Sequence, residues 1–124
     1  MRQGKITTPL VLVNFKCYLE ATGARAVNLA KHAQQISEKL GVTVAVAPQI
    51  ADLRLVSQQV GIPVFAQHID AITPGSHTGH VLAESVVEAG ASGTLVNHSE
   101  RRLEASTIEA TISKAKNVGL TTVV

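Results

Sequence analysis

Aromatic residues and cysteine are scarce in this sequence. Phe, Tyr and Trp together make up 2% of its 124 residues, so the apolar core must be built from Val, Ile, Leu and Ala. Cys17 is the only cysteine, which excludes an internal disulfide, and no Cys-x-x-Cys pair suggests zinc binding or redox chemistry. With 45% hydrophobic and 16% charged residues, the composition is that of an ordinary globular chain.

A strong charge of one sign and a long hydrophobic run are also missing. The formal net charge is +2, and the 11 Lys and Arg residues are scattered, whereas a nucleic-acid-binding surface needs them clustered. The apolar stretch from Pro9 to Val13 is far too short for a signal-peptide core or a membrane span. We therefore expect a cytoplasmic protein with no nucleic-acid partner and no membrane contact.

Short β-branched runs alternate with longer stretches of helical periodicity, which is typical of repeated βα units and a parallel sheet. Strands are expected at residues 10–15, 42–47, 64–67, 94–97 and 121–124. Helices are expected at about residues 23–40, 51–60, 83–89 and 106–118. The pattern is thus about four βα units plus a fifth strand, with no linker or composition break between them.

Two of these helices carry specific expectations. In the first, helical spacing places a set of apolar side chains on one face, and Gly41 is expected to end the helix in a left-handed conformation. That face is formed by Ala26, Leu29, Ala30, Ala33, Ile36 and Leu40. The last helix is predicted to begin at a capping box, Ser106–Glu109, in which the hydroxyl and the carboxylate bind free N–H groups of the first turn.

The last run, Thr121–Val124, has the composition of a buried parallel strand, which needs neighbours on both edges and helices over both faces. Two α/β folds fit the pattern: an open, doubly wound sheet of about five strands, or half of an eight-stranded barrel of roughly 250 residues. In both folds ligands bind at the carboxyl ends of the strands. The residues that follow each strand are therefore the most informative about function.

Polar side chains follow the first strand at Asn14-Phe15-Lys16. Extended geometry places Asn14 and Lys16 on one side of the strand and Phe15 on the other. An amide and an ammonium group that converge on one cavity suit an anionic, oxygen-rich substrate. The alternative is a lysine that is simply solvated as it leaves the strand.

The fourth strand ends directly in a polar cluster, Asn97–Arg102. If Ser99 and Glu100 open a helical turn, His98 lies against its positive end, which leaves a neutral ring able to act as an electrophile or a proton shuttle. The alternative is a histidine that caps a helix or fills a crevice. The neighbouring Asn97, Ser99 and Glu100 favour the functional interpretation.

These two segments, Asn14-Phe15-Lys16 and Asn97-His98-Ser99-Glu100-Arg101-Arg102, resemble the two N-terminal signatures of the triosephosphate isomerase family. Residues 47–49, 65–68 and 74–81 are similar to the shorter, archaeal-type members. The resemblance covers essentially the whole chain, and the order and spacing of the motifs make it more specific than any one of them. It implies that residues 1–124 are the N-terminal half of a single α/β domain, a (β/α)8 TIM barrel.

The resemblance also implies roles for individual residues. His98 would be the catalytic residue that polarises the substrate carbonyl and moves protons between the enediolate oxygens. Asn14 and Lys16 would bind the substrate, Glu100 would support Lys16, and Ser99 would line the pocket. The implied reaction interconverts dihydroxyacetone phosphate and glyceraldehyde 3-phosphate, in glycolysis and gluconeogenesis, with no metal and no organic cofactor.

In this family the loop after the third strand projects into a neighbouring subunit, which implies a homo-oligomer, dimer or tetramer, with Thr78 at the interface. The sequence departs from the common pattern at His68, His80 and Asn97, where Asn, Glu and Gly are usual, and these departures match the archaeal variant. The family's general base follows the sixth strand, and its phosphate loops follow the seventh and eighth. Residues 1–124 contain none of these segments, so we expect the isolated chain to be inactive.

Two alternatives remain open. His68, Asp70, His77, His80 and His98 would form a metal site, as in barrel hydrolases, although His77-x-x-His80 falls in a Gly-containing loop and matches no zinc pattern. Alternatively, the chain would be a non-catalytic half-barrel that self-associates or complements a separate half. This second alternative predicts exposed apolar edges on the first and fifth strands.

Overall fold

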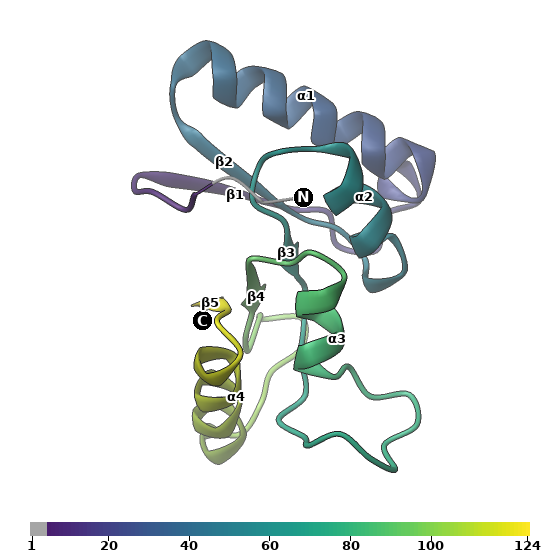
Figure 1. Ribbon diagram of the computed structural model, residues 1–124, viewed down its shortest axis with the longest axis vertical. Coiled ribbons are helices and arrows are strands. Elements are labelled where there is room, and N and C mark those ends of the chain that lie inside the picture. Colours follow the sequence, from purple (N-terminus) through teal and green to yellow (C-terminus); the bar gives the residue numbers. More distant parts are fainter. Residues whose placement is uncertain (1–4) are drawn as a thin grey trace.

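The computed structural model describes residues 5–124, and strands and helices alternate along them (Figure 1). The strands are β1 (Leu10–Asn14), β2 (Thr43–Ala47), β3 (Phe65–Ala66), β4 (Gly93–Leu95) and β5 (Thr121–Val123). The helices are α1 (Ala24–Leu40), α2 (Leu53–Gln59), α3 (Ala83–Glu88) and α4 (Ala105–Asn117), with short 3-10 helices η1 (Leu19–Ala21) and η2 (Ile50–Asp52). Every predicted strand and helix is present, with ends that differ by at most two residues. Across residues 5–124, no helix is both long enough and apolar enough to cross a membrane.

The strands form a parallel sheet in the order in which they occur along the chain. β1 pairs with β2, and β3, β4 and β5 pair in that order. An isolated parallel bridge between Val46 and Val64 joins the two groups. A doubly wound sheet reverses its strand order at a switch point, and this sheet does not. With right-handed crossovers, an order without reversal places all helices on one face, so the strand order is that of a partial (β/α)8 barrel.

Apolar side chains form separate clusters on the two faces of the sheet. On the helix face, Val46 and Ala66 pack with buried residues of the helices. On the opposite face, Ala47 and Phe65 pack with Leu95. Neighbouring residues of one strand thus point to opposite faces, as β geometry requires. The second cluster is the interior of the partial barrel.

Gly93 of β4 lies where the interior leaves no room for a side chain. Its register partners are Phe65 on β3 and Thr121 on β5. A Cβ atom added to Gly93 would lie 2.4 Å from Phe65 Cε2 and 2.6 Å from the Thr121 carbonyl oxygen. The glycine is therefore required by the fully buried Phe65 ring and by the neighbouring backbone.

The buried face predicted for α1 is only partly correct. Its small residues Ala26 and Ala30 are fully buried, because α1 packs closely on β2 and α2. Leu29, Ile36 and Leu40 are instead 39%, 51% and 64% exposed, so the prediction is wrong for these three residues. The end of the helix is as predicted, with Gly41 at φ 67° and ψ 24°, in the left-handed region.

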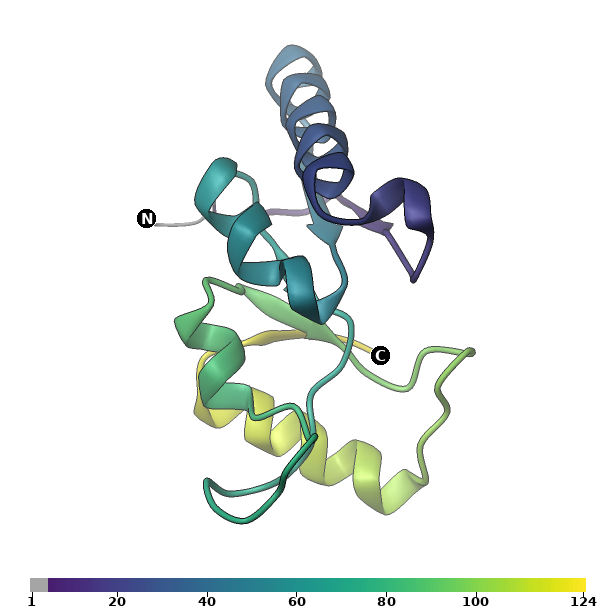
Figure 2. The ribbon, with the colours of Figure 1, turned by 90° about the vertical axis from the view of Figure 1, so that its right-hand side faces the viewer.

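The buried position predicted for the last strand is wrong. Thr121 and Val123 are exposed, because within residues 5–124 β5 pairs only with β4 (Figure 2). At the other edge of the sheet, Val11 and Val13 of β1 are 50% and 37% exposed. The described chain therefore has exposed apolar residues on both edge strands, as the half-barrel alternative predicts.

The predicted capping box at the start of α4 is also absent. The N-cap residue is Glu104, no side chain forms a cap hydrogen bond, and Ser106 already lies inside the first turn. The loop that precedes α4 explains why this helix begins at Ala105, before the predicted capping box. The Asn97 side chain accepts a hydrogen bond from the Leu103 N–H, which closes the loop immediately before Glu104.

Candidate active site

A cleft of about 500 Å³ opens at the carboxyl ends of the strands. The segments that follow β1, β3 and β4 form its walls, which explains why residues far apart in the sequence meet there. The residues that line it are Asn14, Lys16, Cys17, Tyr18, Gln67, His68, Leu95, His98, Glu100 and Arg101. The polar segments predicted after the first and fourth strands therefore share one cavity.

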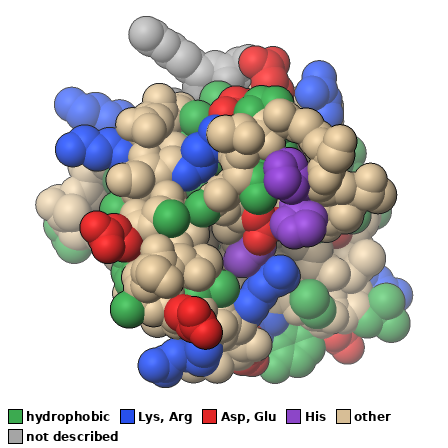
Figure 3. All heavy atoms as spheres, turned by 90° about the horizontal axis from the view of Figure 1, so that it is seen from below, with side chains coloured by type: hydrophobic (Ala, Val, Ile, Leu, Met, Phe, Trp, Pro, Cys, Tyr) green, Lys and Arg blue, Asp and Glu red, His purple; other side chains and the backbone are tan. Residues whose placement is uncertain are grey.

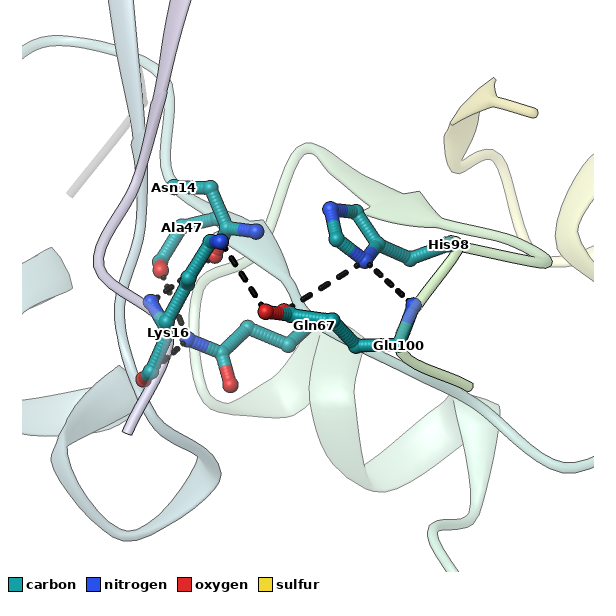
Figure 4. Close-up of polar contacts among 6 residues, drawn as sticks. All are labelled: Asn14, Lys16, Ala47, Gln67, His98 and Glu100. Carbon is teal, nitrogen blue, oxygen red and sulfur yellow. Dashed lines mark hydrogen bonds and ion pairs between the residues drawn. The ribbon is translucent and has the colours of Figure 1, made fainter. Parts of the chain in front are cut away.

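Lys16, Glu100 and His98 form a connected group in this cleft, with the glutamate carboxylate between the other two side chains (Figure 4). Lys16 Nζ donates a hydrogen bond of 2.9 Å to Glu100 Oε1, and Glu100 Oε2 lies 3.5 Å from His98 Nδ1. The hydrogen bond from Lys16 lowers the pKa of Glu100, and the same bond raises the pKa of Lys16. Each group thus favours the charged form of its partner at neutral pH.

The His98 ring accepts a hydrogen bond from the backbone. The Glu100 N–H lies 3.1 Å from His98 Nδ1, so Nδ1 is an acceptor. From this contact we assign the neutral tautomer with its proton on Nε2. The carboxylate at 3.5 Å is too far from Nδ1 for a strong hydrogen bond. Within residues 5–124 nothing accepts the Nε2 proton, so it is available to an oxygen atom in the cleft.

Ser99 and Glu100 do not open a helix after His98. Residues 99–100 make a single turn, closed by a 2.7 Å hydrogen bond from the Arg101 N–H to the His98 carbonyl. The ring therefore faces one backbone N–H rather than the positive end of a helix. Ser99 is exposed and does not line the cleft, so the structure does not bring this predicted residue to the site.

Asn97 lies directly before His98, at a position where the family pattern usually has a glycine. Its φ of 59° lies in the left-handed region, which asparagine adopts more readily than most residues with a side chain. Its Oδ1 also accepts the Leu103 N–H at 2.7 Å. The side chain therefore closes the loop that carries His98 and Glu100, which a glycine cannot do.

Sequence reasoning assigned no role to Gln67, which follows β3. Its Nε2 donates to the Lys16 carbonyl at 2.8 Å and to the Ala47 carbonyl at 3.0 Å (Figure 4). Lys16 has a left-handed φ of 50°, and its N–H donates to Asn14 Oδ1 at 2.9 Å. The available signal was a polar side chain directly after a buried strand, the same signal that identified Asn14.

The loop between β3 and α3, residues 71–80, extends away from the rest of the chain (Figure 1). At its base the Asp70 N–H donates to the Val81 carbonyl at 2.9 Å, and the Val81 N–H donates to Asp70 Oδ2 at 2.7 Å. His68 Nε2 lies 2.8 Å from Asp70 Oδ1. Burial alone raises the pKa of Asp70, but the hydrogen bond from Val81 and the contact with His68 outweigh it and lower that pKa. Thr78 is exposed on the loop.

The histidines predicted as metal ligands in the alternative interpretation do not form a metal site within residues 5–124. The rings of His77 and His80 are 5.7 Å apart, and His68 contacts Asp70. Histidine side chains gather on the face shown in Figure 3. No group of three or more His, Cys, Asp or Glu residues in the described chain could hold a metal ion, so this alternative gains no support.

The sequence profile of the family described as triosephosphate isomerase matches residues 9–124. The chain belongs to the triosephosphate isomerase family. It is 53% identical over 115 residues to the triosephosphate isomerase of Methanocaldococcus jannaschii, which covers 93% of this chain and 52% of that protein. Over 117 residues it is 55% identical to the triosephosphate isomerase of Methanobacterium bryantii, covering 94% and 52% of the two chains. The archaeal-type resemblance predicted from the motifs is confirmed.

A solved triosephosphate isomerase structure, from Bartonella henselae, superposes with a TM-score of 0.80 at 20% identity. The match covers 94% of this chain and 50% of the Bartonella chain. It confirms the TIM-barrel fold class. The chain spans about half the length of the triosephosphate isomerases that it matches.

Proposed function

We propose that residues 1–124 form the N-terminal half of a single TIM-barrel domain, and that the complete barrel interconverts dihydroxyacetone phosphate and glyceraldehyde 3-phosphate. The observation that carries this proposal is the group formed by Lys16, Glu100 and His98 in one cleft at the carboxyl ends of the strands. The family membership and the names of the relatives support it. Triose phosphate is the proposed small-molecule partner.

Lys16 and Asn14 bind the substrate in this proposal. The Lys16 side chain is 39% exposed and lines the cleft, so it is accessible to a phosphorylated, anionic molecule. Glu100 holds that ammonium group in place through the 2.9 Å hydrogen bond. The cleft volume of about 500 Å³ lies within the range of small-molecule sites.

His98 acts on the oxygen atoms of the substrate. A base removes a proton from the carbon beside the carbonyl, the released electron pair forms the C=C bond of an enediolate, and negative charge develops on the carbonyl oxygen. The Nε2–H of a neutral His98 donates to that oxygen and stabilises the charge. A neutral imidazole then passes the proton between the two oxygens, and the base returns its proton to the other carbon. No metal or organic cofactor takes part in these steps.

The base itself comes from outside these residues in our proposal. Within residues 5–124, Glu100 is the only carboxylate that lines the cleft, and it is bound to Lys16. A general base must lie within hydrogen-bonding reach of the proton that it removes. The family resemblance supplies a glutamate after the sixth strand of the complete barrel, so the isolated chain should be inactive.

The proposed test is an assay of glyceraldehyde 3-phosphate isomerisation by the 124-residue chain, alone and mixed with a separately made C-terminal half of the Methanocaldococcus jannaschii relative. The C-terminal half is also assayed alone. Activity that appears only in the mixture, and not in a mixture made with the His98→Ala chain, supports a site divided between the halves. No activity in a mixture whose halves are shown to associate contradicts the proposal.

The proposal also covers the cellular compartment and the oligomeric state. We propose a cytoplasmic homo-oligomer, dimer or tetramer, in which the loop of residues 71–80 inserts into a neighbouring subunit and Thr78 contacts that subunit's site. The extension of this loop and the exposure of Thr78 support an interface role. Replacement of residues 72–79 by a short Gly-Ser linker should reduce the oligomer to a monomer in sedimentation experiments on the complete protein.

A second candidate function is a non-catalytic half-barrel that self-associates or complements another half. It is favoured by the exposed apolar residues Val11, Val13 and Val123 on the two edge strands. Such edges pair with other strands. Light scattering of the 124-residue chain tests it, and a monomer at all concentrations would exclude self-association.

A further inference from the structure

We infer that Gln67 is a positioning residue that fixes the backbone of Lys16, and through it the direction of the Lys16 ammonium group. This inference rests on the proposed function, because it gives Gln67 a role at the same site. A positioning role of Gln67 differs from a general packing role in one respect. Gln67 should matter for activity only as long as Lys16 is present.

The backbone of Lys16 is held at both of its polar groups. Its N–H donates to Asn14 Oδ1 at 2.9 Å, and its carbonyl accepts from Gln67 Nε2 at 2.8 Å (Figure 4). Between these two bonds, Lys16 has a φ of 50°. A residue with a β-carbon is strained in this region and stays there only when its surroundings hold it. Asn14 lies on the same segment as Lys16 and moves with it, so Gln67 supplies the contact to a different strand.

Gln67 also connects Lys16 to the sheet. The second hydrogen of its amide nitrogen goes to the Ala47 carbonyl at 3.0 Å, at the end of β2. The Phe15 N–H donates to that same carbonyl at 3.0 Å. One amide group therefore joins the ends of β1, β2 and β3 at the residue that carries the ammonium group.

The chemistry of this contact requires an amide. Both acceptors are carbonyl oxygens, so the side chain must supply two N–H donors from one nitrogen. A glutamate has the same shape but only accepts, and it would place a carboxylate against two carbonyl oxygens. A methionine fills a similar volume and donates nothing. Both replacements keep a similar side-chain volume and remove the N–H donors. They therefore separate the effect of the hydrogen bonds from the effect of packing.

The test uses a fused barrel, in which residues 1–124 continue into the C-terminal half of the Methanocaldococcus jannaschii relative. In Gln67→Met we expect kcat/KM to fall about tenfold, since each lost hydrogen bond is worth roughly two- to tenfold. Gln67→Glu should lose at least as much. Gln49→Met is the matched control, because the Gln49 amide also follows a strand and contacts Tyr18 and Thr22, but not Lys16.

The deciding measurement is a double-mutant cycle with Lys16→Ala. If Gln67 acts through Lys16, adding Gln67→Met to Lys16→Ala should change kcat/KM less than twofold. If the two losses multiply, Gln67 has only a structural role and the inference is overturned. An unchanged kcat/KM in folded Gln67→Met and Gln67→Glu also overturns it.

A second readout does not depend on activity. In the fused barrel, hydrogen exchange of the Lys16 amide by NMR reports its bond to Asn14. We expect exchange at least tenfold faster in Gln67→Met and unchanged in Gln49→Met. An unchanged Lys16 amide would overturn the positioning role, even if the fused barrel is active. A changed amide in a barrel that proves inactive would support the positioning role and count against the proposed function alone.

Discussion

Lys16 and Glu100 are 84 positions apart in the sequence, yet Lys16 Nζ and Glu100 Oε1 lie 2.9 Å from one another. The contact joins the end of β1 to the loop after β4 across the mouth of the partial barrel. Glu100 also contacts His98, because its backbone N–H donates to His98 Nδ1, so one residue touches both proposed functional groups. Its removal should therefore affect binding and chemistry together.

The first prediction concerns Glu100→Gln in the fused barrel. The amide keeps the shape but removes the charge that attracts Lys16, so we expect kcat/KM to fall roughly tenfold with no change in fold by circular dichroism. Glu109→Gln, the same change at an exposed residue of α4, should leave kinetics unchanged. Equal activity of the two variants would remove Glu100 from the site.

The pH dependence of this pair follows from the direction of the pKa shifts. Hydrogen bonding to Lys16 lowers the pKa of Glu100, so its ionised form persists below the ordinary range of glutamate. The pair is lost only as the pH falls through that lowered pKa. Between about pH 5 and 8 the difference in kcat/KM between wild type and Glu100→Gln should thus stay constant. A difference that already shrinks in this interval would contradict the assignment.

His98→Gln and Lys16→Ala test the proposed catalytic and binding groups. We expect kcat/KM to fall by about 10² to 10⁴ for His98→Gln, which is typical when a general acid or an oxyanion donor is lost. Lys16→Ala should mainly raise KM and also reduce kcat. His32→Gln on the exposed side of α1 is the control for loss of an imidazole. Near wild-type activity in either site variant would refute that residue's role.

Gly93→Ala should destabilise the fold without touching the cleft residues. The added methyl group would collide with the Phe65 ring and with the Thr121 backbone, so the free energy of unfolding should fall by about 2 kcal/mol. Gly61→Ala is the matched control, because a Cβ there meets only Gln34 Oε1, at 3.6 Å. Urea denaturation of the fused barrel measures both variants. A Gly93→Ala barrel as stable as Gly61→Ala would show that the interior tolerates the methyl group.

Asp70→Asn tests the base of the extended loop. The folded-state pKa of Asp70 is below its ordinary value, so its carboxylate stabilises the fold at all pH values above the unfolded pKa of about 3.9. That stability is lost as the pH falls through the lower, folded-state pKa. At pH 7 the variant should be less stable by about 1 to 3 kcal/mol, with a weaker pH dependence below about pH 4. Unfolding curves at several pH values measure this, and parallel curves would contradict it.

Local sequence signals were sufficient for the elements and for most of the site. β-Branched runs, helical spacing and glycine stops located every strand and α-helix of residues 5–124 within two residues, because these signals act over a few neighbouring positions. The polar residues after the first and fourth strands identified Asn14, Lys16, His98 and Glu100 as cleft residues. The capping box failed because the loop closed by Asn97 decides where α4 begins.

By itself the sequence determined the order of the elements, the family and the residues that converge at the strand ends. Only the tertiary structure decided which apolar faces are covered, since burial depends on what packs against a helix or strand: Ala30 is buried and Ile36 is exposed on the same helix. It also decided the backbone of Lys16, because its left-handed conformation is held by Gln67, 51 positions away. Such a contact depends on how separate strands align at one end of a sheet, which no local pattern encodes.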